Sequence, residues 1–497
     1  MKLLTGLIIW FVASTAMATD RPNVLFIMTD DLNCNIGAYG HPLVRTPHID
    51  RLAEEGLLFE NAFCNFPLCG PSRASFMTGL YPDQNGVTRL RRMFRRYVPD
   101  AVTLSQHFMN NGYAVARVGK IYHYDNPGGI GTNGHDDPLS WEERINPRGR
   151  DKEEQHLIEV IRGISTDKIG GTLSWMAAGG DDLEQTDGMV ATESIALMRE
   201  YTAQGRPFFL AVGFYKPHTP FVAPRKYFDL YDPEEIEIPR VPDGYFNTLP
   251  APAVKTLTVK KAQLDLPEAT QREVIHAYYA TISFLDAQVG RLITALEELE
   301  LKDHTIVLFS SDHGYHMGEH DHFQKQTLFE DADRVPLILS VPGMASAGKR
   351  TPAIVEMIDF YRTLTELAGL EQPPSYIQGK SMVSVLNDPE KQTRESALTQ
   401  HYEGYTIRTK RYRYTYWPDA NGLNAELYDR LNDPAEMVNL AGHANYEDVQ
   451  MQLHALWKQR VEEAKAIPDG LEFIPPGPED NGIGSAEALR LFKEGKL

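Results

Sequence analysis

Four apolar segments of the chain each run directly into a cluster of polar residues. They span residues 22–28, 112–118, 207–215 and 305–310, and helical stretches separate them. Continuous hydrophobicity of this kind is typical of parallel strands that are covered on both faces of a sheet. Ligands bind beyond the carboxyl ends of such strands. The pattern therefore predicts an α/β protein whose four polar clusters meet at one edge of its sheet.

The rest of the chain predicts a second, smaller unit. Apolar residues recur at helical spacing over residues 274–300, whereas beyond residue 386 aromatic-rich runs such as 412–417 alternate like strands. A helix is expected over 446–466. The Pro-rich stretch 239–252 is interpreted as a surface excursion near the pocket. We expect a large N-terminal domain over residues 19–385 and a C-terminal subdomain over 386–497.

Acidic residues follow the first and the last of the four apolar segments. Asp30 and Asp31 come after the first, and Asp312 and His313 come after the last. Three carboxylates near one point repel one another unless a cation neutralises them, and oxygen ligands suit Ca²⁺ or Mg²⁺ better than Zn²⁺. The alternative for each pair alone is a helix cap or a tight turn. The sequence thus predicts a hard divalent-cation site.

The run from Cys64 to Pro82 contains Cys69-Gly-Pro-Ser-Arg73 and ends in Thr-Gly-Leu-Tyr-Pro. Gly70 and Pro71 suit a turn into a helix, so Cys69 is expected at the positive end of a helix dipole. The guanidinium of Arg73 lies one turn further on and could hold an anionic oxygen or the nucleophile. The alternative is a buried structural cysteine beside a surface arginine.

This run resembles the signature of type I sulfatases, in which the cysteine is oxidised to formylglycine. The resemblance extends from Asn23-Val-Leu-Phe-Ile through the segment 312–320 to the segment 426–434. Lys216-Pro-His218-Thr-Pro-Phe and Gly404-Tyr-Thr-Ile-Arg-Thr409 are similar to the iduronate-2-sulfatase-like branch of the family. The implied fold resembles alkaline phosphatases and sulfatases. It has a large mixed, mostly parallel sheet flanked by helices, and a smaller C-terminal α+β domain with an antiparallel sheet.

The resemblance also implies a set of site residues. One cation, Ca²⁺, would be bound by Asp30, Asp31, formylglycine 69, Asp312 and His313. Around the formylglycine would lie Arg73, Lys120 and His123, with Lys120 and Arg73 stabilising its deprotonated hydroxyl. His218 and Lys325 would contact the sulfate from the leaving-group side.

The implied reaction starts with attack of one oxygen of the hydrated aldehyde on sulfur, while His218 or Lys325 protonates the departing alcohol. His123 would then remove a proton from the second hydroxyl, which expels sulfate and restores the aldehyde. The branch resemblance implies exo-type action on a sulfated saccharide such as a 2-O-sulfated uronate. A phosphonate or phosphate ester hydrolase on the same scaffold, and a non-catalytic polysaccharide-binding protein, are the alternatives.

The amino terminus predicts export. Residues 1–18 have a basic start, a short apolar core from Leu3 to Val12 and a small-residue cleavage site at Ala16-Met-Ala18, as in a signal peptide. We expect a periplasmic or secreted enzyme without a stable membrane anchor, which meets a formylglycine-generating maturase. The three cysteines exclude a disulfide scaffold, although Cys34 and Cys64 could pair in an oxidising compartment.

The remaining charged and polar clusters bear on partners. A net charge of −19 argues against general nucleic-acid binding. A cluster of arginines after the signature could bind carboxylates or further sulfates, or form a solvated face: Arg89, Arg91, Arg92, Arg95 and Arg96. The spacing of His316, His320 and His322 matches no zinc framework, and His320 is expected to contact substrate or order its loop, while the other two have no assigned role. The segment 128–134 is interpreted as a flexible pocket-side loop.

Overall fold

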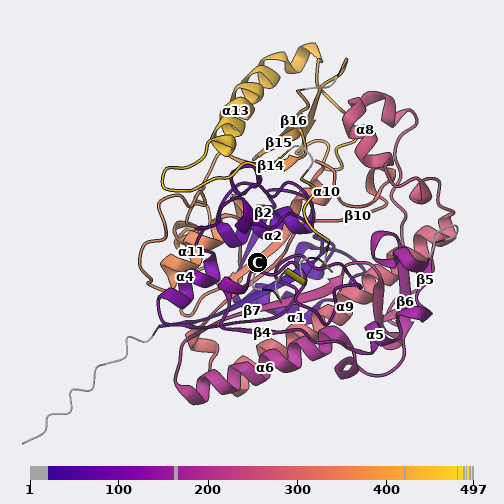
Figure 1. Cartoon of the computed structure of the whole chain (residues 1–497). Helices are drawn as coiled ribbons and strands as arrows, with labels where there is room; N and C mark the ends of the chain where they lie inside the picture. The colour runs from indigo at the N-terminus through magenta and orange to yellow at the C-terminus, as the bar shows by residue number, and fades with distance from the viewer. Residues whose placement is uncertain are drawn as a thin grey trace, which may run out of the picture.

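The computed structural model describes residues 21–161, 166–418, 421–477 and 480–484, and positions 487, 490, 491 and 494. The predicted signal peptide, residues 1–18, lies outside the described residues. A central sheet of eight strands organises the molecule (Figure 1). In spatial order its strands are β13 (Lys349–Glu356), β2 (Leu57–Phe63), β12 (Arg334–Ser340), β9 (Thr305–Ser311), β1 (Asn23–Asp30), β7 (Phe208–Pro217), β3 (Ala114–Gly119) and β4 (Glu143–Ile145).

Most neighbouring strands of this sheet run parallel. Strand β12 is antiparallel to both of its neighbours, and all the other pairs are parallel. The four apolar segments become β9, β1, β7 and β3, which are adjacent in the sheet. The predicted mixed, mostly parallel sheet is confirmed. The carboxyl ends of these four strands lie at one edge, which is where the polar clusters follow them.

Both faces of the sheet are buried under helices. In β1, Leu25 and Ile27 pack with α9 (Glu268–Glu298), α6 (Thr186–Gln204) and α1 (Pro47–Glu55). Val24 and Phe26 pack on the opposite face with α2 (Cys69–Thr78), α4 (Leu104–Asn110) and α11 (Asp359–Leu367). A fully buried side chain of this size contributes roughly 1.5–3 kcal/mol, so a register slip in β1 would be costly on both faces.

The predicted helix over 274–300 is longer at its start than its apolar pattern indicated. Helix α9 begins at Glu268, directly after Pro267, which caps it. The additional first turn is polar, so hydrophobic periodicity does not mark it, whereas the fixed backbone of a proline sets the start. Within the described residues, no helix has both the length and the apolar character needed to cross a membrane.

A smaller antiparallel sheet follows the central one in sequence. It consists of β14 (Ser396–His401), β15 (Gly404–Thr409), β16 (Tyr412–Tyr416) and β17 (Ala425–Asp429). Helix α13 (Glu447–Lys465) covers it through Leu453, Trp457 and Val461. The predicted C-terminal antiparallel sheet and its helix are confirmed. A division near residue 385 stays a prediction, and it falls between the end of β13 and the start of β14.

A buried ion network attaches this small sheet to the segment that follows Lys325. Arg413 of β16 is fully buried and lies 2.7 Å from a carboxylate oxygen of each of Glu330, Asp333 and Glu436. Glu330 and Asp333 bound helix α10 (Glu330–Asp333). Removing one partner of such a network leaves an uncompensated buried charge, which costs about 3–5 kcal/mol. This network therefore fixes the C-terminal sheet to helix α10.

His401, at the end of β14, predicts a dependence of stability on pH. Its ring packs on Phe66 and Tyr402, and neither ring nitrogen has a hydrogen-bond partner among the described residues. Burial lowers the pKa of His401 to about 3. The unfolded chain gains a proton below its ordinary pKa of about 6.5 and the folded chain does not, so stability falls as the pH falls through that value.

Replacing this histidine with phenylalanine is expected to remove the loss of folding stability that it causes at acidic pH. Relative to the wild type, His401→Phe should gain about 2 kcal/mol in free energy of unfolding between about pH 7.5 and about pH 5. Urea unfolding at the two pH values measures the change. An unchanged difference between variant and wild type would show that His401 takes up its proton in the folded protein.

Candidate active site

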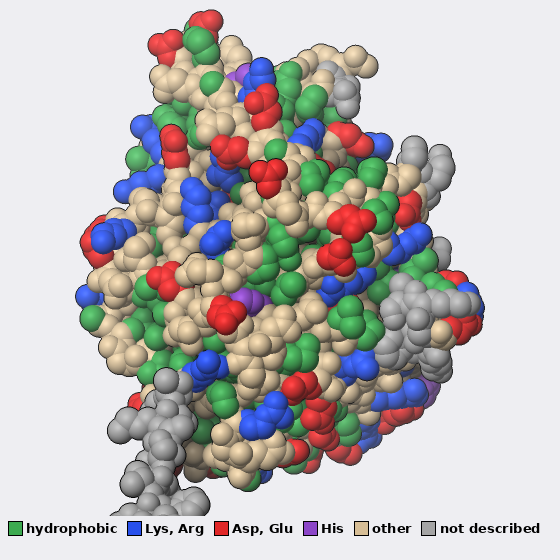
Figure 2. Space-filling model, turned by 60° about the vertical axis from the view of Figure 1, so that its left-hand side comes forward, with side chains coloured by type: hydrophobic (Ala, Val, Ile, Leu, Met, Phe, Trp, Pro, Cys, Tyr) green, Lys and Arg blue, Asp and Glu red, His purple; other side chains and the backbone are tan. Residues whose placement is uncertain are grey.

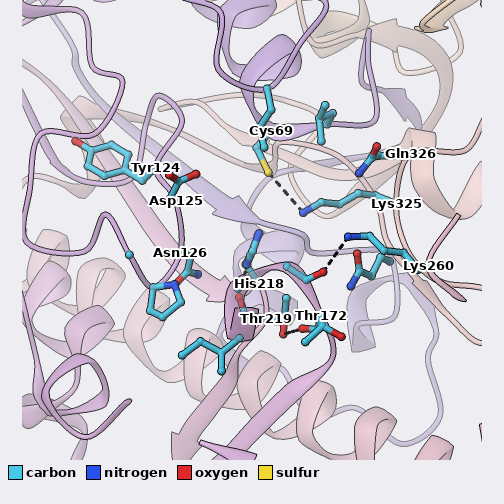
Figure 3. A pocket seen from close by; sticks show the side chains of 18 of the residues that line it. Cys69, Tyr124, Asp125, Asn126, Thr172, His218, Thr219, Lys260, Lys325 and Gln326 are labelled. Carbon is cyan, nitrogen blue, oxygen red and sulfur yellow. Dashed lines mark hydrogen bonds between the residues drawn. The ribbon is translucent and has the colours of Figure 1, made fainter. Parts of the chain in front are cut away.

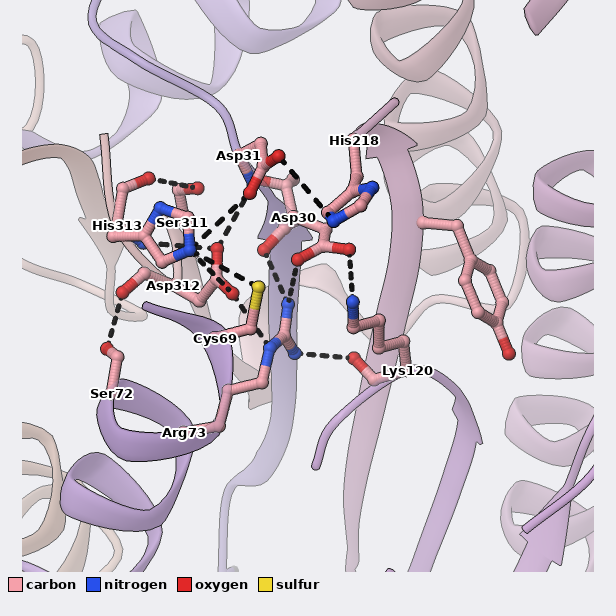
Figure 4. Close-up of polar contacts among 12 residues, drawn as sticks. Asp30, Asp31, Cys69, Ser72, Arg73, Lys120, His218, Ser311, Asp312 and His313 are labelled. Carbon is pink, nitrogen blue, oxygen red and sulfur yellow. Dashed lines mark hydrogen bonds and ion pairs between the residues drawn. The ribbon is translucent and has the colours of Figure 1, made fainter. Parts of the chain in front are cut away.

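Polar residues at the carboxyl ends of four strands converge beneath the first turn of α2 (Figure 4). Asp30 ends β1, Asp312 follows β9, Lys120 follows β3 and His218 follows β7. All four are buried. Asp31 adopts a left-handed backbone with φ 69°, which aspartate tolerates better than most residues. The structure thus brings together side chains that are hundreds of residues apart.

The turn at Asp31 is fixed from two sides. Its backbone N–H donates to Asp312 Oδ1 at 3.1 Å, and its carbonyl accepts from Tyr278 Oη at 2.7 Å. Tyr278 lies on α9, where the sequence pattern marked it only as a core residue. It is therefore a positioning residue that sequence reasoning missed, because a buried hydroxyl on a helix gives no separate signal in the pattern.

Arg73 lies on the first turns of α2 with no exposed surface. Its Nε donates to Asp312 Oδ2 at 2.9 Å, and Nη2 donates to Asp30 Oδ1 at 3.2 Å. The other three N–H groups go to the backbone carbonyls of Thr29, Lys120 and Ile121. A guanidinium has five N–H donors. None remains for a nucleophile or a substrate, so Arg73 orients and neutralises the carboxylates and is not a surface residue.

Asp30 is held in its charged form by its neighbours. Lys120 Nζ lies 2.5 Å from Asp30 Oδ2. Burial alone would raise the pKa of Asp30, but the positive charges of Lys120 and Arg73 hold that pKa well below its usual range. This carboxylate is therefore ionised at any pH of interest.

Asp31 lacks such compensation at one oxygen. Lys325 Nζ lies 2.5 Å from Asp31 Oδ1, whereas the buried Oδ2 has no hydrogen-bond partner among the described residues. Burial raises the pKa of Asp31 to about 7. The positive charge of Lys325 opposes this shift, and the negative charges of Asp30 and Asp312 add to it. An ionised carboxylate left in this position is costly unless a cation approaches it.

His313 completes the cluster of possible ligands. Its Nδ1 hydrogen-bonds to the Gly314 carbonyl at 2.8 Å, so Nε2 faces the carboxylates. That Nε2 lies 3.4 Å from Asp31 Oδ1, 3.5 Å from Asp312 Oδ2 and 3.3 Å from Cys69 Sγ. Overlapping triads of these residues place their ligand atoms within 4.8 Å of one another. The residues present fit one small, hard cation.

Cys69 begins α2 and faces this cluster. Lys325 Nζ lies 3.5 Å from its Sγ. Burial raises the pKa of the Cys69 thiol well above its usual value. An unmodified Cys69 is therefore a protonated thiol, which is a poor nucleophile and a poor ligand for a hard cation.

Cys69 opens into a cavity of about 1020 Å³ (Figure 3). His218 and Lys325 lie at its inner end, and His123 lies in its wall. His218 Nδ1 hydrogen-bonds to the Thr219 carbonyl, and its Nε2 lies 3.8 Å from Asp31 Oδ2. Burial lowers the pKa of His123 to about 3, so its imidazole is neutral. The remaining walls come from residues 124–128, 169–172, 259–263 and 324–326.

Most of the arginines that follow the signature are bound to protein groups. Arg95 pairs with Asp137 at 2.8 Å, and Arg92 Nε donates to the Asp480 carbonyl at 2.8 Å. Arg96 Nη1 lies 3.9 Å from Asp480 Oδ1. Arg91 reaches the cavity. Figure 2 shows charged side chains of both signs interspersed over one face of the molecule.

Three further expectations are resolved by the side-chain contacts. His320 Nδ1 hydrogen-bonds to Tyr245 Oη, and its ring stacks on Phe329 at 3.9 Å, so it orders its own loop. Of the glycine-rich segment 128–134, Gly128 lines the cavity. Cys34 and Cys64 are both free, so the pair considered for them is not formed.

Comparison with known proteins identifies the class of this site. The model of the Sulfatase family matches residues 22–370, and that of N-sulphoglucosamine sulphohydrolase, C-terminal, matches residues 318–463. The chain belongs to the sulfatase family and is a sulfuric ester hydrolase. It is 32% identical to the iduronate 2-sulfatase of Homo sapiens, over 87% of this chain and 92% of that protein. This likeness confirms the iduronate-2-sulfatase-like branch.

Solved structures share the fold. A protein in complex with its substrate D-glucosamine-2-N,6-O-disulfate has a TM-score of 0.70 at 24% identity, with 90% of this chain and 98% of that chain covered. The phosphonate monoester hydrolase of Agrobacterium radiobacter has a TM-score of 0.75 at 23% identity, with 89% of this chain and 96% of that chain covered.

Proposed function

We propose that this sulfatase removes sulfate from a sulfated saccharide, with a formylglycine at position 69 as its nucleophile and one Ca²⁺ at its site. The observation that carries the proposal is the buried carboxylate of Asp31. Its Oδ2 has no hydrogen-bond partner among the described residues, and it stands among Asp30, Asp312 and His313, directly beside Cys69. A hydrated aldehyde at position 69 would add an oxygen to this set of donors.

The cation would be held by Asp30, Asp31, Asp312, His313 and the modified residue 69. Bound there, Ca²⁺ would supply positive charge for the sulfate oxygens in the transition state. Lys120 and Arg73 add their charges through Asp30 and Asp312, and Lys325 lies within reach of position 69. Electrostatic stabilisation by preorganised groups of this kind is a large part of enzymatic rate enhancement.

The modification gives residue 69 two hydroxyl groups. One of them, after losing its proton, would attack sulfur through its oxygen as the bond from sulfur to the sugar oxygen breaks, and His218 or Lys325 would protonate the departing alcohol. The neutral His123 then takes the proton of the second hydroxyl, the bond from residue 69 to the sulfate oxygen breaks, and sulfate leaves. Water rehydrates the aldehyde. We propose that a maturase oxidises Cys69 and that the enzyme works in the periplasm or outside the cell.

The proposed substrate is a 2-O-sulfated uronate or a similar unit derived from a polysaccharide, cleaved in an exo manner. The human relative is named for iduronate 2-sulfate, and the shared sequence covers most of both chains. The cavity of about 1020 Å³ is large enough for a saccharide unit beside the nucleophile.

A phosphonate or phosphate ester hydrolase is the second candidate. One solved structure of the same fold is a phosphonate monoester hydrolase, and a cation with lysine charges also suits phosphoryl transfer. We expect kcat/KM for an aryl sulfate to exceed that for the matching aryl phosphonate ester, by about tenfold or more if differential binding of the transition state is worth about 1.4 kcal/mol.

Parallel assays on protein from a host with a suitable maturase measure this ratio. Faster turnover of the phosphonate would reverse the ranking. Saccharide binding without turnover of either ester would instead favour a non-catalytic polysaccharide-binding protein.

A further inference from the structure

One wall of the cavity carries polar groups that the sulfatase reaction does not use. The segment 259–263 follows α8 (Ala251–Thr258) and ends in a short helical turn, Lys261–Gln263. It lies in the irregular region after the Pro-rich stretch. Because none of its residues stands at the end of a strand, the sequence pattern did not mark them as functional. Figure 3 shows Lys260 reaching into the cavity on the same side as Lys325.

Lys260 is a cation without an acidic partner. Its Nζ donates to the Gly171 carbonyl at 2.9 Å, and its other two N–H donors have no acceptor among the described residues. Lys120 and Lys325 each have a carboxylate oxygen at 2.5 Å, whereas no carboxylate of the described residues lies within ion-pair distance of Lys260. Burial and the charge of Lys325 lower the pKa of Lys260. An anion bound from solution would stabilise the charged form of Lys260 against both its burial and its repulsion from Lys325.

Gln263 provides an independent observation in the same wall. Its side chain is 5% exposed, and neither Oε1 nor Nε2 has a hydrogen-bond partner among the described residues. Gln324, which also lines the cavity, has a buried Nε2 that likewise lacks a partner among those residues. Buried amides without partners are costly and uncommon. A sugar hydroxyl, which is both donor and acceptor, would satisfy such an amide.

We propose that Lys260 and Gln263 form a second binding subsite, which takes a further anionic group and a neighbouring hydroxyl of the saccharide whose sulfate is cleaved. The anionic group is a carboxylate or a second sulfate, because both present oxygen acceptors to an ammonium group. This inference rests on the proposed saccharide substrate. It makes Lys260 a determinant of specificity for substrates with two negative charges and assigns it no part in bond breaking.

The test compares Lys260→Met with Lys255→Met, a matched change at an exposed lysine on α8. The substrates are 4-nitrophenyl sulfate, a 2-O-sulfated uronate disaccharide, and the same disaccharide with its carboxylate reduced, with and without a second sulfate. Lys260→Met is expected to raise KM for the uronate by about tenfold or more, because a charge-assisted hydrogen bond is lost. For 4-nitrophenyl sulfate, kcat/KM should stay within about twofold of the wild type, and Lys255→Met should change neither value.

The carboxyl-reduced substrates separate the two anions. A carboxylate subsite predicts that reduction raises the wild-type KM and that a second sulfate does not restore it, whereas restoration would assign the subsite to sulfate. If Lys260→Met lowered kcat/KM equally for all substrates, Lys260 would lie at the scissile sulfate, and the proposal would be overturned. Unchanged values on all of them would overturn it as well.

Measuring equilibrium binding tests the subsite independently of whether the enzyme cleaves the substrate. If the wild type cleaved none of the esters, the proposed function would fail, and calorimetric titration of the uronate disaccharide would decide on the subsite. Affinity about tenfold weaker in Lys260→Met supports it, and equal affinity or no binding by the wild type rejects it. Gln263→Leu should also weaken binding without lowering the unfolding midpoint, because the amide it removes has no hydrogen-bond partner among the described residues.

Discussion

Cys69→Ser is expected to lower the steady-state kcat for sulfate ester hydrolysis by about 10⁴-fold or more. A serine hydroxyl could attack sulfur in the surroundings that the structure shows, with Lys325 close to position 69 and the carboxylate cluster beneath it. The resulting sulfate ester would have no second hydroxyl. Without a second hydroxyl, His123 has no proton to remove, so sulfate is not expelled. The enzyme would therefore stop after one turnover.

Intact-protein mass spectrometry after incubation with substrate measures this outcome. Cys69→Ser should gain the mass of one sulfuryl group, and Cys69→Ala, which has no nucleophile, should gain none. Sustained turnover by the serine variant would show that the cycle does not need an aldehyde hydrate. Absence of the adduct in a folded serine variant would show that the side chain at position 69 does not attack sulfur.

Removing the divalent cation is expected to abolish activity and lower the unfolding midpoint, and Ca²⁺ should restore both. Asp30, Asp31 and Asp312 are all buried, and Asp31 Oδ2 has no partner among the described residues. Calcium at about 100 times its dissociation constant would stabilise the folded chain by about 2.7 kcal/mol. Thermal unfolding and aryl sulfatase assays before and after chelation measure the two effects.

Asp31→Asn tests whether the cation binds at this cluster. The change removes one ligand charge at nearly constant shape, so activity should fall by about 10²-fold or more and the calcium-dependent rise in the unfolding midpoint should disappear. Asp286→Asn is the matched control. That carboxylate is also buried, but it accepts from the backbone N–H groups of His48 and Ile49 at the start of α1. A full calcium response in Asp31→Asn would place the cation elsewhere.

The convergence of the strand ends could be predicted from sequence because it depends on local rules. Continuous apolar segments mark parallel strands, and Asp30, Lys120, His218 and Asp312 each stand directly at or after one of them. The adjacency of β9, β1, β7 and β3 then brings those residues to one edge. The small antiparallel sheet was predictable for a similar reason, since its aromatic strands alternate.

The hydrogen-bond partners of individual side-chain donors could not be predicted from the sequence. Arg73 looks like an anion ligand in sequence, but its five N–H groups are all used by the protein, which only three-dimensional contacts reveal. Arg92 and Arg96 meet Asp480, which for Arg92 is a separation of 388 residues in the sequence. Lys260 and Gln263 lie on an irregular segment, where neither hydrophobic periodicity nor strand-end position marks a residue as functional.

Peptide mass spectrometry of position 69, combined with a count of active sites, tests the central claim most directly. The protein is prepared with a maturase, digested and measured alongside its aryl sulfatase activity. We predict that an aldehyde or its hydrate replaces the Cys69 thiol, that activity per mole of total protein rises in proportion to the modified fraction, and that kcat per counted active site stays constant. Full activity in a preparation that retains the thiol at position 69 would contradict the account.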